Sequence, residues 1–210
     1  AEYLILAKNR LGDVLKDINY EIVDEFEGKK LVGQSYEPIF DYYKNVNIEN
    51  KENAWKIYGA DFVTTEDGTG IVHIAPAFGS DDLVLAQKNK LPIIYHVGTD
   101  GRFKQEIVDF AGKSVKPKEN PQEADIEVLK NLAGRSLLFA KKKIIHSYLH
   151  CWRCETPLLN YASSSWFVKV SAIKEKIIFK NKKVNWIPKD LRDGRFGKWL
   201  EGAHDWAISR

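Results

Sequence analysis

The side chains best suited to chemistry are a histidine and an aspartate, His73 and Asp82, and two cysteines, Cys151 and Cys154. A carboxylate can neutralise an ammonium group. A histidine can donate a hydrogen bond or wall off one side of a pocket, according to its tautomer. Two cysteines separated by two residues can supply two thiolates, which are half of a tetrahedral zinc site. The sequence therefore offers one candidate ligand pocket and one candidate metal site.

The histidine and the aspartate flank a predicted junction between a strand and a helix. Residues Gly70 to Ala75 are mostly apolar and predict a buried strand, which Pro76 ends. Ser80 is a good N-cap for a helix that we expect to run to Lys90. Asp82 then lies in the first helical turn, where the helix dipole favours a carboxylate. A helix start beside a strand end is concave and rich in free backbone N–H groups, so it can hold a small polar ligand.

These residues also have a plain structural interpretation. His73 could be a satisfied core histidine, and Asp82 a routine acid in a first helical turn. Another histidine, His96, lies in the strand predicted over residues 91–97, and we expect it to be structural. The spacing of the residues is compatible with both interpretations.

The cysteine pair has the tight spacing of a zinc knuckle. Cys151 and Cys154 supply two ligands, and His146 or His150 could add one, but a closed zinc site needs four ligands of definite geometry. A redox role would place the pair between a strand and a helix, whereas residues 155–158 predict another strand. We therefore expect a structural zinc site that residues outside this chain complete.

Composition indicates a globular protein. The chain has 210 residues, of which 44% are hydrophobic, and a net charge of +3, which neither requires nor excludes nucleic acid. No apolar run reaches the roughly 18 to 20 residues of a membrane span, and no signal peptide is visible, so we expect a soluble, intracellular protein. The chain starts at Ala1 and contains no methionine, which leads us to expect a piece of something longer.

The succession of predicted elements favours a mainly β fold with inserted helices, of the α+β class. Many short strands separated by turns, with two inserted helices at 80–90 and 121–134, are typical of a closed or nearly closed barrel. The expected strands cover residues 2–7, 20–26, 54–58, 61–65, 70–75, 91–97, 137–140 and 143–148, and the expected helices cover 10–16, 80–90, 121–134 and 172–181.

The composition changes beyond residue 168, where aromatic side chains stand among lysines and arginines. These aromatics are Trp186, Phe196, Trp199 and Trp206. They could stack on the bases of an RNA end, or they could pack on a neighbouring domain. The run from Lys141 to Lys143 is similarly a solvated turn or a phosphate contact.

Three ordered motifs together resemble the class I isoleucyl-tRNA synthetases, in the region of their editing domain. The motifs are Gly68–His73 (GTGIVH) with Ala75–Gly79 (APAFG) and Asp82, then His146–Tyr148 with His150–Cys154 (HCWRC) and Thr156–Leu158, and finally Arg195–Glu201 (RFGKWLE) with Asp205–Arg210 (DWAISR). The valyl enzymes share the first and last patterns, but the block that holds the cysteines favours the isoleucine enzyme.

The resemblance implies a closed β-barrel editing domain of the valyl, isoleucyl and leucyl type. It places this barrel at residues 1–145, a zinc knuckle with a return strand at 146–168, and a segment that leads back to the catalytic core at 169–210. The threonine-rich strand of the family would precede Ala1. We therefore expect that the isolated chain cannot charge tRNA and that its editing is impaired or lost.

The same resemblance assigns roles to residues. The catalytic residues would be His73, which lies against the substrate side chain and helps to exclude isoleucine, and Asp82, which holds the α-ammonium group of the misattached valine. The substrate-binding residues would be Gly70, Ala77, Phe78 and Gly79, the last two as contacts of the terminal adenosine.

The expected cofactors and partners also follow from the resemblance. Cys151 and Cys154 would hold half of a zinc site, and ATP and magnesium would serve the full-length enzyme without binding this fragment. The partners would be tRNA(Ile) with its misattached valine and the remainder of a monomeric, cytoplasmic synthetase chain, with no membrane. The alternatives are a valyl-tRNA synthetase editing domain and a noncatalytic module that binds tRNA through the zinc knuckle and the basic aromatic end.

Overall fold

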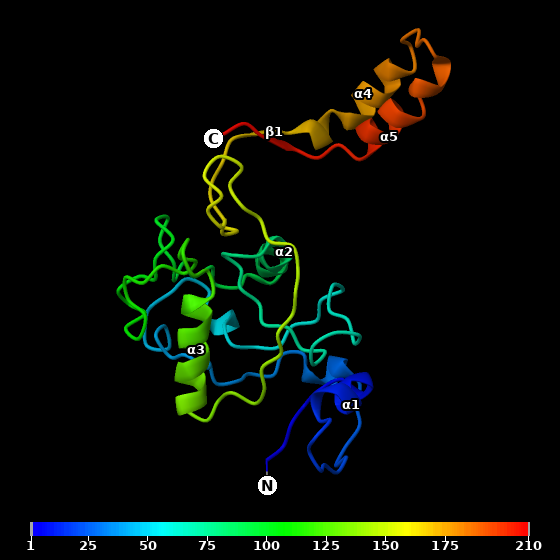
Figure 1. Ribbon diagram of the computed structural model, residues 1–210. Helices are drawn as coiled ribbons and strands as arrows, with labels where there is room; N and C mark the ends of the chain where they lie inside the picture. Colours follow the sequence, from blue (N-terminus) through cyan, green and yellow to red (C-terminus); the bar gives the residue numbers. More distant parts are fainter. Residues whose placement is uncertain (1, 210) are drawn as a thin grey trace. The chain divides into compact units, whose positions relative to one another are not determined.

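The computed structural model describes residues 2–209, and the chain divides into two compact units, Ala1–Ala162 and Ser163–Arg210 (Figure 1). The helices of the first unit are α1 (Leu11–Val14), α2 (Ser80–Asn89) and α3 (Glu123–Gly134), with 3-10 turns at Lys8–Arg10, Gly28–Leu31 and Lys51–Asn53. The second unit contains β1 (Phe167–Val168), a 3-10 turn at Val170–Ala172, α4 (Lys174–Asn181), a 3-10 turn at Lys189–Leu191, α5 (Arg195–Glu201) and β2 (Trp206–Ala207). The domain boundaries expected at residues 145 and 168 stay predictions.

The helix α2 forms where the sequence predicts it. Its N-cap is Gly79 rather than Ser80, which is instead the first helical residue. Asp81 and Asp82 occupy the first turn, and Lys90, at a φ of 54°, ends the helix in the left-handed region. The predicted register is therefore correct to within one residue.

Hydrogen-bonded strands are sparse in the part of the chain that the structure describes. Within residues 2–209, β1 and β2 make the one ladder, and isolated bridges join Ser35 to Lys56, Val97 to Phe103, Arg102 to Ser114 and His150 to Pro157. Residues 71–75 have no ladder partner among the residues described, and Ile71 and Val72 are each 50% exposed, so the predicted burial of this segment is wrong. The closed barrel stays a prediction.

The core of the first unit gathers around α2 and the segment that follows it. Leu85 and Ala86 of α2 are buried, as are Val97 and Phe110. The ring of Phe110 packs against Phe103 at a centroid distance of 5.6 Å. Further buried apolar residues are Leu15, Leu31, Ala77, Ile107 and Ala124. This core fixes the start of α2, where Ala77 is only 1% exposed.

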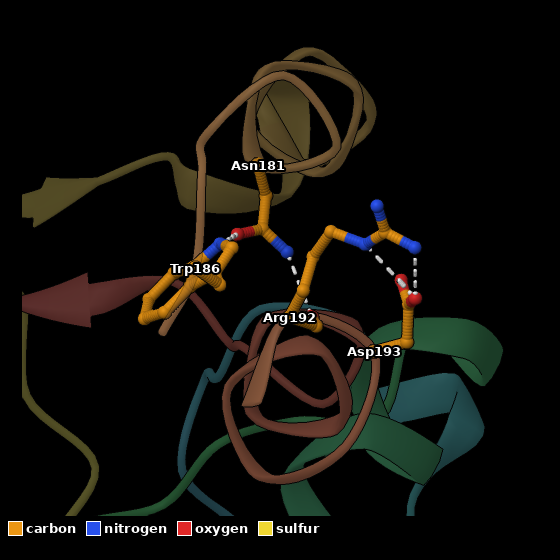
Figure 2. A network of polar contacts seen from close by, with 4 residues as sticks. All are labelled: Asn181, Trp186, Arg192 and Asp193. Atoms are coloured by element: carbon orange, nitrogen blue, oxygen red, sulfur yellow. Dashed lines mark hydrogen bonds and ion pairs between the residues drawn. The ribbon is translucent and has the colours of Figure 1, made fainter. Parts of the chain in front are cut away.

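A buried amide organises the second unit, in which α4 packs against α5. Asn181 is 7% exposed; its Nδ2 donates to the carbonyl of Arg192 and its Oδ1 accepts from Nε1 of Trp186, both at 2.9 Å (Figure 2). Arg192 also pairs with the carboxylate of Asp193, on the exposed side of the same turn (Figure 2). One side chain thus satisfies two polar groups that packing would otherwise leave unpaired.

The ends of the second unit are tied by backbone pairing. Phe167 stands opposite Ala207 and Val168 opposite Trp206 in an antiparallel ladder. Asp205 accepts a hydrogen bond from the Ser171 backbone N–H at 2.8 Å, and this contact lowers the pKa of the Asp205 carboxyl. These contacts close a short segment whose helices are too short to be stable alone.

None of the helices within residues 2–209 combines the length and the apolar composition that crossing a membrane requires.

Replacing Asn181 by leucine should destabilise the second unit, because the Trp186 indole N–H and the Arg192 carbonyl lose their partner. We expect the free energy of unfolding to fall by about 1 to 3 kcal/mol. Urea unfolding followed by tryptophan fluorescence measures this, because four of the six tryptophans lie in this unit. The matched control is Asp193→Asn, which removes an exposed ion pair of the same turn and should hardly move the midpoint. Equal midpoints for Asn181→Leu and the parent would contradict the role of the amide.

Candidate functional site

The carboxylate of Asp82 turns back from the first turn of α2 onto the segment before the helix. Its Oδ2 accepts a hydrogen bond from the Ala75 backbone N–H at 3.0 Å. The carbonyl of Ala75 in turn accepts from the N–H groups of Phe78 and Gly79, at 2.8 and 3.1 Å. Both backbone polar groups of Ala75 are therefore hydrogen-bonded within residues 75–82, and the carboxylate is held at the helix start.

Gly79 leaves the space that this carboxylate needs. A Cβ atom at position 79 would lie 2.5 Å from Oδ2 of Asp82 and 2.8 Å from its Cγ. Such approaches are shorter than van der Waals contact. A glycine at the N-cap therefore permits the hydrogen bond between Asp82 and Ala75.

Phe78 lies in an aromatic cluster with His96, Tyr161 and Tyr95. Its ring meets His96 at a centroid distance of 4.6 Å and Tyr161 at 5.7 Å, both edge to face, and Tyr161 also contacts Tyr95 at 5.2 Å. Edge-to-face pairs of this kind are favourable. The preceding residue, Ala77, accepts a backbone hydrogen bond from Ala162 at 2.8 Å. The cluster thus anchors the turn that carries the candidate substrate contacts.

His73 is exposed, which does not fit the interpretation of a core histidine. Burial lowers the pKa of His96, and the electrostatic influence of His73 lowers it further. The structure groups Ala77, Phe78 and Asp82 around one turn, and His73 lies two residues before Ala75 in the segment that leads into that turn.

Gly70 has a different role from the other candidates. Its φ of 78° lies in the left-handed region, and a Cβ there would lie 2.5 Å from the Cβ of Ala7. The neighbouring Thr69 carbonyl accepts from the Ala7 N–H at 2.8 Å. The glycine lets residues 69–70 pack closely against the amino-terminal segment.

The sequence does not reveal that His96 and Tyr161 support this site. His96 is predicted to be structural, and Tyr161 lies far from the turn along the chain. Only the fold brings Tyr161 back, where its hydroxyl donates to the Val97 carbonyl at 3.3 Å. No local sequence pattern signals such a contact.

The cysteines lie in a tight hairpin turn. The Cys151 N–H donates to the Thr156 carbonyl at 2.9 Å, and the Glu155 N–H donates to the Cys151 carbonyl at 2.8 Å. Cys154 contacts the Thr156 hydroxyl, Sγ to Oγ1, at 3.1 Å. The hydrogen bond from that hydroxyl is the main reason that the pKa of Cys154 is lowered from 9.0 to about 7. A thiol that ionises near neutral pH suits a metal ligand.

The pair fits half of a zinc site. Within residues 2–209 there is no group of three or more histidine, cysteine, aspartate or glutamate side chains that could hold a metal ion. Both cysteines are free, Cys154 is exposed and Cys151 is partly exposed, so two thiolates on one turn could meet ligands from elsewhere.

Three aromatics of the second unit pack on one another, whereas Trp206 is 56% exposed. Phe196 lies 4.8 Å from Trp186 and 5.7 Å from Trp199, measured between ring centroids. With Leu191 and Arg195 they line a cavity of about 330 Å³. Trp199 is still 54% exposed, so the cluster leaves apolar surface uncovered.

Comparison with known proteins assigns the family. A family model described as tRNA synthetases class I (I, L, M and V) matches residues 102–210, which is half of the chain. The chain belongs to the class I tRNA synthetases. This confirms the class I part of the resemblance that the sequence motifs indicate.

Relatives within this family are similar along the whole chain. An isoleucine–tRNA ligase of Bdellovibrio bacteriovorus is 46% identical over 209 residues, which cover 99% of this chain and 19% of the relative. Isoleucine–tRNA ligases of Treponema denticola and Clostridium acetobutylicum are each 44% identical, over 91% and 100% of this chain and 18% and 19% of the relatives. The chain therefore spans about a fifth of the length of the curated relatives that it matches.

Replacing Gly79 by alanine should displace the Asp82 carboxylate and release the Ala75 N–H. We expect the free energy of unfolding to fall by about 1 to 3 kcal/mol, which is the usual cost of leaving a buried polar group without its hydrogen-bond partner. Amide hydrogen exchange at Ala75 should accelerate accordingly. The matched control is Gly28→Ala, because a Cβ at Gly28 meets no atom within 4 Å. Unchanged protection of Ala75 in Gly79→Ala would show that the carboxylate does not hold the turn.

Cys154 should react with iodoacetamide as a thiol of pKa about 7. The rate should rise with pH through that value, because the thiolate is the reactive species. Thr156→Val removes the hydroxyl hydrogen bond and should move the midpoint upward, towards 9.0. Mass spectrometry of the metal-free chain distinguishes modification at Cys154 from modification at Cys151. A midpoint that Thr156→Val leaves in place would contradict the assigned cause.

Proposed function

We propose that this chain is the editing region of an isoleucine–tRNA ligase, which hydrolyses the ester of valine misattached to tRNA(Ile). The observation that carries the proposal is the carboxylate of Asp82, held at the start of α2 by the Ala75 N–H. Within residues 2–209 this is the one hydrogen bond that the carboxylate accepts, and it uses Oδ2. Oδ1 is thus available for an α-ammonium group, which it would both neutralise and orient.

The chemistry of the amino acids explains why such a site is needed. Isoleucine exceeds valine by one methylene group, which an apolar pocket distinguishes by only about 1 to 3 kcal/mol. A second pocket that admits valine and excludes isoleucine by bulk removes the resulting errors. In the proposed site His73 lies against the substrate side chain, and its exposed position leaves it accessible to a ligand.

Hydrolysis requires a water molecule at the ester carbonyl. The water oxygen bonds to the carbonyl carbon, the bond from that carbon to the ribose oxygen breaks, and the ribose oxygen takes up a proton. Asp82 orients the substrate by its ammonium group, and the turn with Phe78 and Gly79 lies beside it to contact the terminal adenosine. Fixed orientation of this kind supplies a large part of enzymatic rate acceleration.

The proposal extends to the parts of the enzyme around this chain. The closed β-barrel would be completed by a threonine-rich strand that precedes residue 1, so the isolated chain would edit poorly or not at all. ATP and magnesium would act elsewhere in a monomeric, cytoplasmic enzyme. The zinc site would take two further ligands from outside this chain, and the ion would serve to fix the hairpin of Cys151 and Cys154.

One observation favours a second candidate, a noncatalytic module that binds tRNA. Trp152 is 85% exposed, and the guanidinium of Arg153 lies 4.9 Å from its ring centroid. An exposed aromatic ring beside a cation can stack on a base. The Asp82 variant described next discriminates the two candidates, because only the editing hydrolase needs this carboxylate.

Asp82→Ala should strongly slow editing in the full-length enzyme that carries this segment. We expect hydrolysis of Val-tRNA(Ile) to fall by about a hundredfold, which corresponds to about 2.7 kcal/mol of transition-state stabilisation. Charging with isoleucine should not change. The matched control is Asp81→Ala, which removes the adjacent, exposed carboxylate of the same helical turn and should leave hydrolysis as it is. If Asp82→Ala retains full hydrolysis while Lys141→Ala, Lys142→Ala and Lys143→Ala together abolish tRNA binding, the noncatalytic module is the better interpretation.

A further inference from the structure

His96 contacts Phe78, a residue of the turn in the proposed editing site. Its ring lies edge to face against Phe78, at a centroid distance of 4.6 Å. Its backbone is fixed, because the carbonyl of His96 accepts from the Lys104 N–H at 3.0 Å and the next residue, Val97, is only 3% exposed. The imidazole itself is half-buried. A ring on a rigid backbone can therefore hold Phe78 in place.

Hydrogen bonds of a single turn connect Phe78 to the carboxylate of Asp82. Phe78 donates its N–H to the Ala75 carbonyl at 2.8 Å, and Ala75 donates its own N–H to Asp82 at 3.0 Å. Movement of the Phe78 ring away from His96 would therefore disturb the residue that orients Asp82. His96 lies at the far end of this short series of contacts.

We propose that His96 is a positioning residue of the editing site: as a neutral ring it holds Phe78 and the turn over residues 75–79, and on protonation it releases them. This inference rests on the proposed editing function and adds to it a dependence on acid. It concerns a residue that contacts neither the ester nor the attacking water.

The groups around His96 set the direction of the pH effect. Burial disfavours its charged form, and the charges of His73 and Lys104 also lower the pKa of His96, whereas the backbone at Ile94 favours the proton. The phenol rings of Tyr95 and Tyr161 complete the cluster. Since the pKa of His96 lies below its ordinary 6.5, the unfolded chain binds the proton more tightly than the folded one. The stabilising contact between His96 and Phe78 is therefore fully present above the ordinary pKa of 6.5. It is lost as the pH falls through the lowered pKa of His96 in the folded chain.

The test compares two replacements in the full-length enzyme. His96→Phe keeps an aromatic ring against Phe78 but cannot take up a proton, and His96→Ala removes the ring. Single-turnover hydrolysis of Val-tRNA(Ile), divided by the uncatalysed rate, is measured from about pH 5 to about pH 8, the range in which histidines titrate. The control is His204→Phe, because His204 is an exposed histidine of the second unit.

We expect the parent and His204→Phe to lose activity on the acid side. His96→Phe should match the parent to within about twofold at neutral pH and lose less activity in acid, whereas His96→Ala should be slower by about tenfold to a hundredfold throughout, as for a misplaced substrate contact. An acid loss in His96→Phe equal to that of the parent, or parental rates in His96→Ala, would overturn the inference.

The Asp82→Ala variant distinguishes failure of the proposed editing function from failure of the role of His96. If Asp82→Ala hydrolyses Val-tRNA(Ile) at the parental rate, the editing function itself is wrong. If Asp82→Ala is inactive but the His96 variants behave like the parent, only the role of His96 is wrong. Charging with isoleucine reports whether each variant is folded, and should His96→Ala fail to fold, the acid profile of His96→Phe still decides.

Discussion

The hydrogen bond between the Ala75 N–H and the Asp82 carboxylate is the contact on which the candidate site depends. It places a charged group at the start of α2, where the helix dipole stabilises it. It also joins two elements, because the donor belongs to the turn and the acceptor to the helix. Packing of Ala77, Leu85 and Ala86 keeps both elements in place, and so the apolar core determines where the charge lies.

Much of this arrangement could be predicted from the sequence, because its signals are local. Pro76, Gly79 and the acids that follow mark a helix start within one residue of its actual position. The long helix α3 is equally clear from its apolar spacing, and the motifs around Cys151 and Cys154 identify the family before any coordinates are known. Residues that start or end a helix, and the family motifs, are therefore the parts of the sequence that carry most information here.

The remaining features depend on contacts between distant parts of the chain. Nothing near Tyr161 indicates that it packs on Phe78, and a histidine in an apolar run such as His96 is usually structural. Strand pairing is similarly non-local: residues 70–75 have an apolar pattern, but a ladder also requires a partner strand. The buried amide of Asn181 is different: its partners follow it by only 5 and 11 residues, but the sequence does not indicate that this asparagine is buried.

The close approach of Gly79 to Asp82 couples the two positions, because a Cβ atom at 79 would lie 2.5 Å from Oδ2 of the carboxylate. A side chain at position 79 therefore has to displace the carboxylate at 82, which would lose its hydrogen bond to the Ala75 N–H. Substitutions at 79 and 82 are therefore expected to be non-additive, because a chain that already lacks the acid at 82 has no carboxylate for a side chain at 79 to displace.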